Sequence, residues 1–105
     1  MTSNEYQELA KQTLTPECDT IDYLALGLAG ESGEVAEVVK KHIRGDFDWD
    51  VLNLRLMGEL GDVLWYVSNI ARKAGINLED CMRYNIQKLQ ARQANNTIKG
   101  DGDNR

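Results

Sequence analysis

Residues 24–67 read LALGLAGESGEVAEVVKKHIRGDFDWDVLNLRLMGELGDVLWYV and contain two long helix-forming runs joined by a short acidic turn. The first run ends at Gly45, and the second begins near Asp50. Both runs repeat apolar residues every three or four positions, which is the spacing of one helix face, and neither alternates as a strand would. A turn this short predicts that the two helices form an antiparallel hairpin.

Four acidic residues lie on the apolar sides of these two helices. Glu31 lies in the middle of an apolar stripe, within about 60° on the helical wheel of its neighbours Leu24, Leu28, Val35 and Val38. Glu34 lies one turn later, at the edge of the same stripe. In the second helix, Glu59 shares a stripe with Leu52, Leu56, Val63 and Ile70, and Asp62 follows three residues later. Each helix therefore turns a pair of carboxylates toward the expected core.

The two pairs of acids also match in height along the hairpin. Glu31 and Asp62 lie at equal distances in sequence from the turn near Asp46, and so do Glu34 and Glu59. Glu31 should therefore face Asp62, and Glu34 should face Glu59, roughly 16 Å from the turn. Carboxylates gathered between two helices repel one another unless cations neutralise them. Magnesium or manganese suits such oxygen ligands, and the matched positions argue against the alternative of four ordinary solvated acids.

The rest of the chain also favours helices, which gives an all-α, four-helix, bundle-like fold. Helices are expected over residues 3–13, 20–43, 50–74 and 77–95, with Asn77 as the cap of the last one. We expect a single helical domain over residues 1–94 and a tail over residues 95–105, where glycine and aspartate disfavour a helix.

Composition restricts the classes of function. The 105 residues carry a net charge of −5, which argues against a nucleic-acid surface. There is no signal-like apolar segment or run of membrane-spanning length, so we expect a cytoplasmic protein without a membrane partner. Cys18 and Cys81 lack metal-type spacing and are expected to be free thiols.

One chain is not expected to cover the third helix completely. A second apolar side, roughly opposite Asp62, consists of Met57, Leu60, Leu64, Val67 and Ala71. A helix that is apolar on nearly all sides must be covered on all sides. The sequence therefore predicts a homodimer or a tetramer.

Several segments resemble the MazG-like nucleotide pyrophosphohydrolases of the all-α NTP pyrophosphatase superfamily. They are GLAGESGEVAEVVKK (27–41), ELGDVLWYV (59–67), YQELAKQT (6–13) and NIQKLQAR (85–92). The resemblance, which extends to short phage and bacterial members, implies that Glu31, Glu34, Glu59 and Asp62 bind magnesium. It also implies hydrolysis of an NTP or dNTP to the monophosphate and pyrophosphate, which would serve housecleaning of the nucleotide pool. The chain departs from many members at Gly30, where they carry glutamate, and after Arg92.

Positions on the helices, together with the resemblance for the residues of the fourth helix, suggest roles for further residues. Glu34 is our candidate for the general base, because it lies at the edge of its stripe. Residues placed to contact substrate are Lys41, Tyr66, Asn85, Lys88 and Arg92, and Lys99 and Arg105 of the tail could close over it. A dedicated dUTP or dCTP pyrophosphatase, or a helical module that binds nucleotide or metal without turnover, remains an alternative.

Overall fold

The computed structural model describes residues 1–105 and consists of helices and turns, with no strands. The elements are α1 (Ser3–Gln12), the 3-10 turn η1 (Pro16–Cys18), α2 (Ile21–Ile43), α3 (Trp49–Lys73) and α4 (Leu78–Ala94). The four helices begin and end within two residues of the expected positions. The all-α prediction is therefore confirmed.

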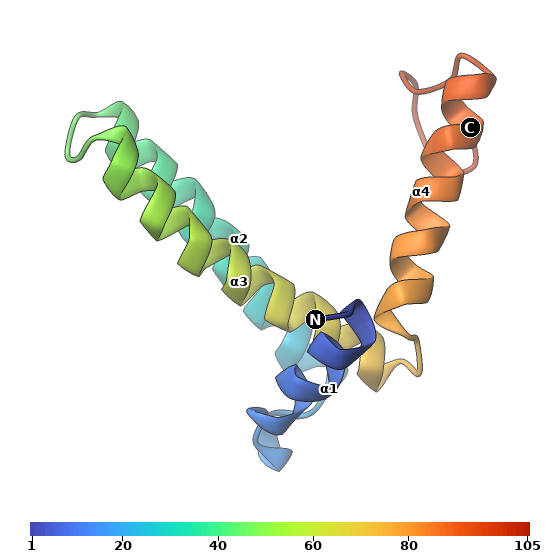
Figure 1. Cartoon of the computed structure of the whole chain (residues 1–105), viewed down its shortest axis with the longest axis horizontal. Helices are drawn as coiled ribbons and strands as arrows, with labels where there is room; N and C mark the ends of the chain where they lie inside the picture. The colour runs from blue at the N-terminus through green and yellow to red at the C-terminus, as the bar shows by residue number, and fades with distance from the viewer.

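The chain has the shape of a V (Figure 1). One arm is the antiparallel hairpin of α2 and α3, and the other arm is α4, which diverges from the hairpin instead of lying along it. The α1 helix crosses the vertex where the two arms meet. The hairpin was expected from the short turn, whereas nothing in the sequence indicated the direction of α4.

Side chains fix the beginnings of the first three helices. Thr2, Thr20 and Asp48 each accept a hydrogen bond from a backbone N–H three residues later, which satisfies a donor that the helix itself leaves free. Gly45 and Gly75 follow α2 and α3 with φ values of +92° and +78°, a conformation that favours glycine. The hairpin turn therefore falls where it was expected.

The N-terminus of α4 is capped differently from the expectation. Asn77 occupies the cap position but its side chain makes no capping hydrogen bond. Instead, Gln7 of α1 accepts a hydrogen bond from the Leu78 N–H at 3.1 Å, and Asn4 accepts one from the Glu79 N–H at 3.4 Å. The first helix of the chain therefore provides the cap of the last one.

The vertex has a polar core. The buried Gln7 also donates from Nε2 to the carbonyls of Ile76, at 2.9 Å, and Ser68, at 3.4 Å. The side chain of Asn69 is fully buried nearby and donates to the carbonyl of Trp65 at 3.1 Å. The bonds of Gln7, together with a longer one of 3.5 Å from Asn69 to the Ala10 carbonyl, tie α1 to the C-terminal end of α3 and thereby position α4.

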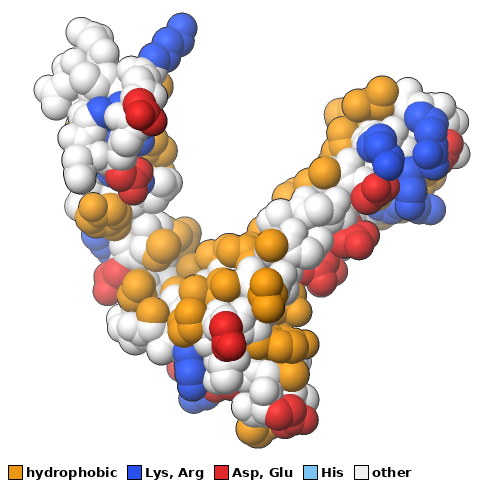
Figure 2. Space-filling view, turned by 180° about the vertical axis from the view of Figure 1, so that it is seen from behind, with side chains coloured by type: hydrophobic (Ala, Val, Ile, Leu, Met, Phe, Trp, Pro, Cys, Tyr) orange, Lys and Arg blue, Asp and Glu red, His pale blue; other side chains and the backbone are white.

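Much of the apolar surface stays uncovered in the single chain. Of the second apolar side of α3, Ala71 is buried at the vertex, but Met57, Leu60 and Leu64 are 74%, 53% and 45% exposed. Apolar side chains gather over the vertex and continue along the hairpin in the space-filling view (Figure 2). The chain has no helix with the length and apolar character needed to span a membrane.

Candidate metal centre

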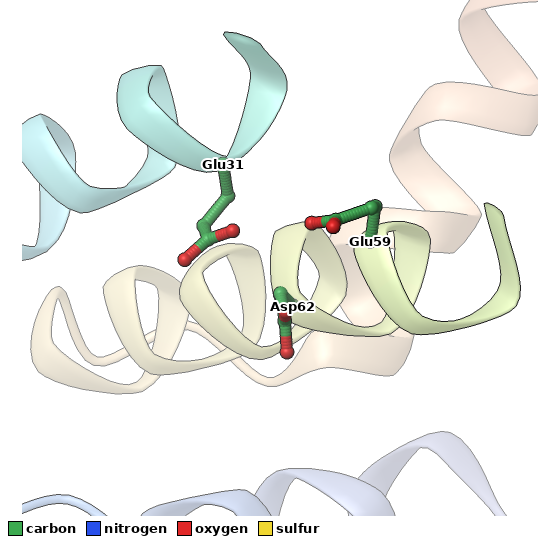
Figure 3. A group of neighbouring side chains, drawn as sticks. All are labelled: Glu31, Glu59 and Asp62. Carbon is green, nitrogen blue, oxygen red and sulfur yellow. The ribbon is translucent and has the colours of Figure 1, made fainter. Parts of the chain in front are cut away.

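Three carboxylates from two helices converge beside the middle of the hairpin. One oxygen from each of Glu31, Glu59 and Asp62 lies within 4.8 Å of the others. Glu31 extends from α2 toward α3, and Glu59 extends toward it from α3 (Figure 3). Asp62, one turn later on α3, contributes the third oxygen of the group. The register of the hairpin therefore brings Glu31 to two acids that lie 28 and 31 positions later in the sequence.

The negative charges of this cluster repel one another. Burial raises the pKa of the half-buried Glu31, and the negative charges of Asp62, Glu59 and Glu34 raise it further. None of the three clustered acids forms an ion pair with a lysine or arginine. The repulsion is therefore not balanced by the chain's own cations, and a bound cation would relieve it.

The donor set restricts the metal that would fit. The cluster contains carboxylate oxygens only, which are the ligands that hard cations such as Mg²⁺ and Mn²⁺ prefer. The nearest positive side chain in sequence to Glu59 is Arg55, and its guanidinium stacks on Phe47 at 4.5 Å from the ring centre. The single histidine, His42, has Nδ1 2.9 Å from the Phe47 carbonyl and does not belong to the cluster.

Glu34, the fourth acid of the predicted set, lies outside the group of converging oxygens. It is exposed on α2, one turn after Glu31, and close enough for its charge to act on the Glu31 carboxyl. In the single chain, its carboxylate is therefore next to the cluster but not part of it.

Tyr6 of α1 is a neighbour of the cluster that the hairpin pattern did not indicate. Burial raises the pKa of its hydroxyl, and the negative charge of Asp62 adds to the effect. The register of a hairpin determines only which residues of α2 and α3 face each other. Tyr6 could not be found in this way, because its place depends on how α1 crosses the vertex.

Tyr66 is held by a close contact between the two hairpin helices. Its ring lies against Gly27 of α2, where a β-carbon would be 2.8 Å from Cδ1 and nearer still to Cε1 and Cζ. The neighbouring Trp65 packs edge-on against it, with the ring centres 4.9 Å apart, and donates its own N–H to the Thr13 hydroxyl at 2.7 Å. Tyr66 is half-buried, and Trp65 has a structural role.

Lys41 lies in the last turn of α2, two to three turns beyond the acids. It is half-buried. Hydrogen bonds from Lys40 and Arg44 lower the pKa of the carboxyls of Glu37 and Asp46, respectively, and the charge of Lys41 adds a smaller effect to both. The structure therefore does not bring Lys41 into contact with the three clustered acids.

The other predicted substrate residues lie on the second arm of the V. Asn85, Lys88 and Arg92 belong to α4, which leads away from the hairpin (Figure 1). Asn85 is exposed, and the other two form ion pairs with Asp103 of the tail. Within one chain, the cationic residues of α4 and the acidic cluster are therefore separate.

Comparison with known proteins identifies the family. The profile of the MazG nucleotide pyrophosphohydrolase domain matches residues 19–97, which include all of the clustered acids. The gene 37 protein of Mycobacterium phage L5 is 41% identical over 95 residues, which cover 85% of this chain and 82% of that protein. No solved structure matches the chain. The chain belongs to the MazG nucleotide pyrophosphohydrolase family.

Proposed function

We propose that this protein hydrolyses nucleoside triphosphates or their deoxy forms between the α- and β-phosphates, giving a monophosphate and pyrophosphate. Magnesium is the proposed cofactor, with manganese as a substitute, and Glu31, Glu34, Glu59 and Asp62 are its proposed ligands. One observation carries the proposal: three carboxylate oxygens from facing helices converge, without a balancing cation, in a chain of this family. Housecleaning of the nucleotide pool is the role we propose for the activity.

The reaction requires positive charge to neutralise the triphosphate and a base to take a proton from the attacking water. A bound magnesium ion would neutralise phosphate charge and acidify water. Glu31, Glu59 and Asp62 would hold that ion between α2 and α3. Glu34 lies beside the cluster but outside it, so its carboxylate is free to accept a proton from water. We therefore assign the general base to Glu34, with a secondary role at the metal.

Replacing Glu34 by glutamine tests this assignment. The substitution keeps the shape of the side chain but removes its basicity, so kcat should fall by about 100-fold or more while the affinity for magnesium changes little. A near-normal kcat with intact magnesium binding would assign the proton transfer to another group.

We further propose that a second copy of the chain completes the site. Lys88, Arg92 and Asn85 lie on α4, away from the acids of their own hairpin, yet the substrate would need both sets of residues. The exposed side chains of Met57, Leu60 and Leu64 give α3 a surface that a second copy could cover. A dimer that buries this surface leaves the acidic cluster open, because the cluster lies on another side of α3. A separate contact in the same dimer would then place α4 of one chain beside the acids of the other.

Mixing two inactive variants tests the shared site. Glu31→Gln removes a metal ligand, and Lys88→Met removes a phosphate contact. If the two residues act in the same site from different chains, a mixture at equal amounts should recover about a quarter of the wild-type activity, because half of the dimers are mixed and each has one intact site. If the mixture recovers no activity, or if sedimentation shows an active monomer, this arrangement is contradicted.

The activity itself is tested with the eight common nucleoside triphosphates. Magnesium-dependent release of pyrophosphate is expected with at least one of them, and Glu31→Gln and Asp62→Asn should abolish it. Glu37→Gln is the matched control, because Glu37 lies on the same helix but is paired with Lys40 outside the cluster.

A separate measurement tests the metal. Magnesium should raise the Tm of the wild type and of the Glu37 variant, but not that of Glu31→Gln. If magnesium stabilises all three proteins equally, the cluster is not the metal site. If magnesium binds but no nucleotide is hydrolysed, the chain is a binding module without turnover.

A further inference from the structure

The segment after α4 folds back against its own helix (Figure 1). Gly100 and Gly102, with φ values of +150° and +81°, allow the chain to reverse direction. Arg105 closes the loop by donating hydrogen bonds to the carbonyls of Thr97 and Ile98, both at 3.0 Å, and to that of Gly102. The tail is therefore a formed loop on the last turns of α4.

This loop places a carboxylate on two cations of α4. The Oδ1 atom of Asp103 lies 3.0 Å from Nζ of Lys88 and 3.2 Å from Nη2 of Arg92. The same Nη2 donates to the Asp103 carbonyl at 2.7 Å. Hydrogen bonds from Lys88 and Arg92 hold the pKa of the Asp103 carboxyl below its usual value. The tail thus covers the two residues that the proposed function assigns to substrate phosphate.

A carboxylate oxygen shared by a lysine and an arginine occupies the position that a phosphate oxygen would take on the same two cations. We propose that Asp103 occupies the phosphate-binding site of Lys88 and Arg92 in the free protein, so that the tail competes with the triphosphate of the substrate. This role rests on the proposed function, because it assumes that Lys88 and Arg92 bind substrate phosphate.

The contacts of Asp103 with Lys88 and Arg92 are weak enough for a phosphate group to displace it. The side chain of Asp103 is 79% exposed, whereas that of Arg92 is only 7% exposed. An exposed carboxylate pairs weakly because water screens it, and a triphosphate carries more negative charge than a single carboxylate. The buried Nε of Arg92 has no hydrogen-bond partner while the tail is in place. Arg92 therefore retains a donor that Asp103 leaves unused and that a larger anion could take.

Binding of inorganic tripolyphosphate tests the competition. The dissociation constant is measured by calorimetry for the wild type, Asp103→Ala and Asp103→Asn at one salt concentration. Both variants should bind tripolyphosphate more tightly than the wild type, by roughly fivefold for alanine, because the internal competitor is removed. Asp101→Asn is the matched control, since it removes the same charge from the tail at a position without an ion pair, and it should stay close to the wild type.

The gain must also depend on the cations. Adding Lys88→Met to Asp103→Ala should abolish the tighter binding. Equal or weaker binding by Asp103→Ala, an equal gain in Asp101→Asn, or no binding of tripolyphosphate by any variant would overturn the proposal. The first of these results would mean that the tail holds Lys88 and Arg92 in place instead of competing for them.

This measurement does not depend on turnover, so the two proposals can fail separately. If the protein hydrolyses a nucleotide, Asp103→Ala should lower KM and leave kcat unchanged. If no nucleotide is hydrolysed, the proposed function fails, and the calorimetric result alone decides whether Asp103 competes for the anion site.

Discussion

Gly27 is the position in the hairpin where adding one methyl group should have the largest effect. In the structure, a β-carbon at this position would lie 2.8 Å from Cδ1 of Tyr66 and nearer still to two other ring atoms. Gly30, one turn later on the same helix, has nothing within 4 Å of the position of its β-carbon. The two glycines therefore form a matched pair for comparing Gly27→Ala with Gly30→Ala.

The expected magnitudes follow from two opposing terms. Replacing glycine by alanine inside a helix stabilises it by about 1 kcal/mol, and both variants gain this term. Gly27→Ala also forces the ring of Tyr66 to move, and crowding of this kind costs about 1–3 kcal/mol. Gly30→Ala should therefore be the more stable protein by about 1–3 kcal/mol, which corresponds to a difference in Tm of at least about 5 °C for a chain of this size.

Thermal unfolding followed by circular dichroism measures this difference, with all proteins at the same concentration because self-association would shift the Tm. Combining Gly27→Ala with Tyr66→Ala should remove most of the cost of the methyl group, since the ring it meets is gone. If Gly27→Ala were as stable as Gly30→Ala, the close contact between Gly27 and Tyr66 would not exist in the protein. If the losses of stability in Gly27→Ala and Tyr66→Ala simply added in the double variant, the cost of the methyl group would not come from the Tyr66 ring.

Three further predictions concern the vertex. Gln7→Ala should lower the free energy of unfolding by about 2–4 kcal/mol in urea unfolding, since it leaves buried backbone groups without partners. Gln7→Glu keeps the acceptor for Leu78 but turns a buried acceptor oxygen toward the carbonyls of Ser68 and Ile76, so at pH 7 it should be at least as destabilising as alanine. The hydrogen bond from Arg72 lowers the pKa of Asp19 in the folded protein. This pair therefore stabilises the fold at any pH above the unfolded pKa of about 3.9, and the stabilisation is lost as the pH falls through the lower pKa of the folded protein. Asp19→Asn should therefore be less stable than the wild type at pH 7 but equal to it near pH 2, and a constant difference across this range would contradict the ion pair. Trp65→Phe should cost about 1 kcal/mol through the lost hydrogen bond to Thr13, and an unchanged urea midpoint would show that this bond contributes nothing.

The parts of the structure that could be predicted from sequence are those set by local geometry. Helical rise is constant and the turn is short, so the position of Asp46 determines which residues of the hairpin face each other. This reasoning found the three converging acids. It placed Glu34 with them as well, whereas in the structure the converging group does not include Glu34, although its charge acts on the Glu31 carboxyl.

The parts that could not be predicted depend on contacts between distant segments. In the sequence, Gln7 has no feature that distinguishes it from a surface residue. It is buried because its side-chain nitrogen and oxygen both form hydrogen bonds with the backbone, at Ser68, Ile76 and Leu78. Asp103 gives no signal in a polar tail, and its place on Lys88 becomes visible only once the tail has reversed. The direction of α4 likewise depends on the vertex and not on any pattern within the helix.

The cap of α4 by Gln7 has a consequence for the order of folding. The two residues of this hydrogen bond, Gln7 and Leu78, are 71 positions apart, so α4 cannot acquire its cap from its own neighbours as the other helices do. The hairpin can form from contacts that are local in the chain, whereas the junction requires closure of a long loop, which is slow. During synthesis, α1 must therefore wait for most of the chain to emerge before Gln7 meets its partner. We expect the hairpin to fold early and α4 to dock late, so that a kinetic intermediate would contain the acidic cluster but lack the second arm of the V.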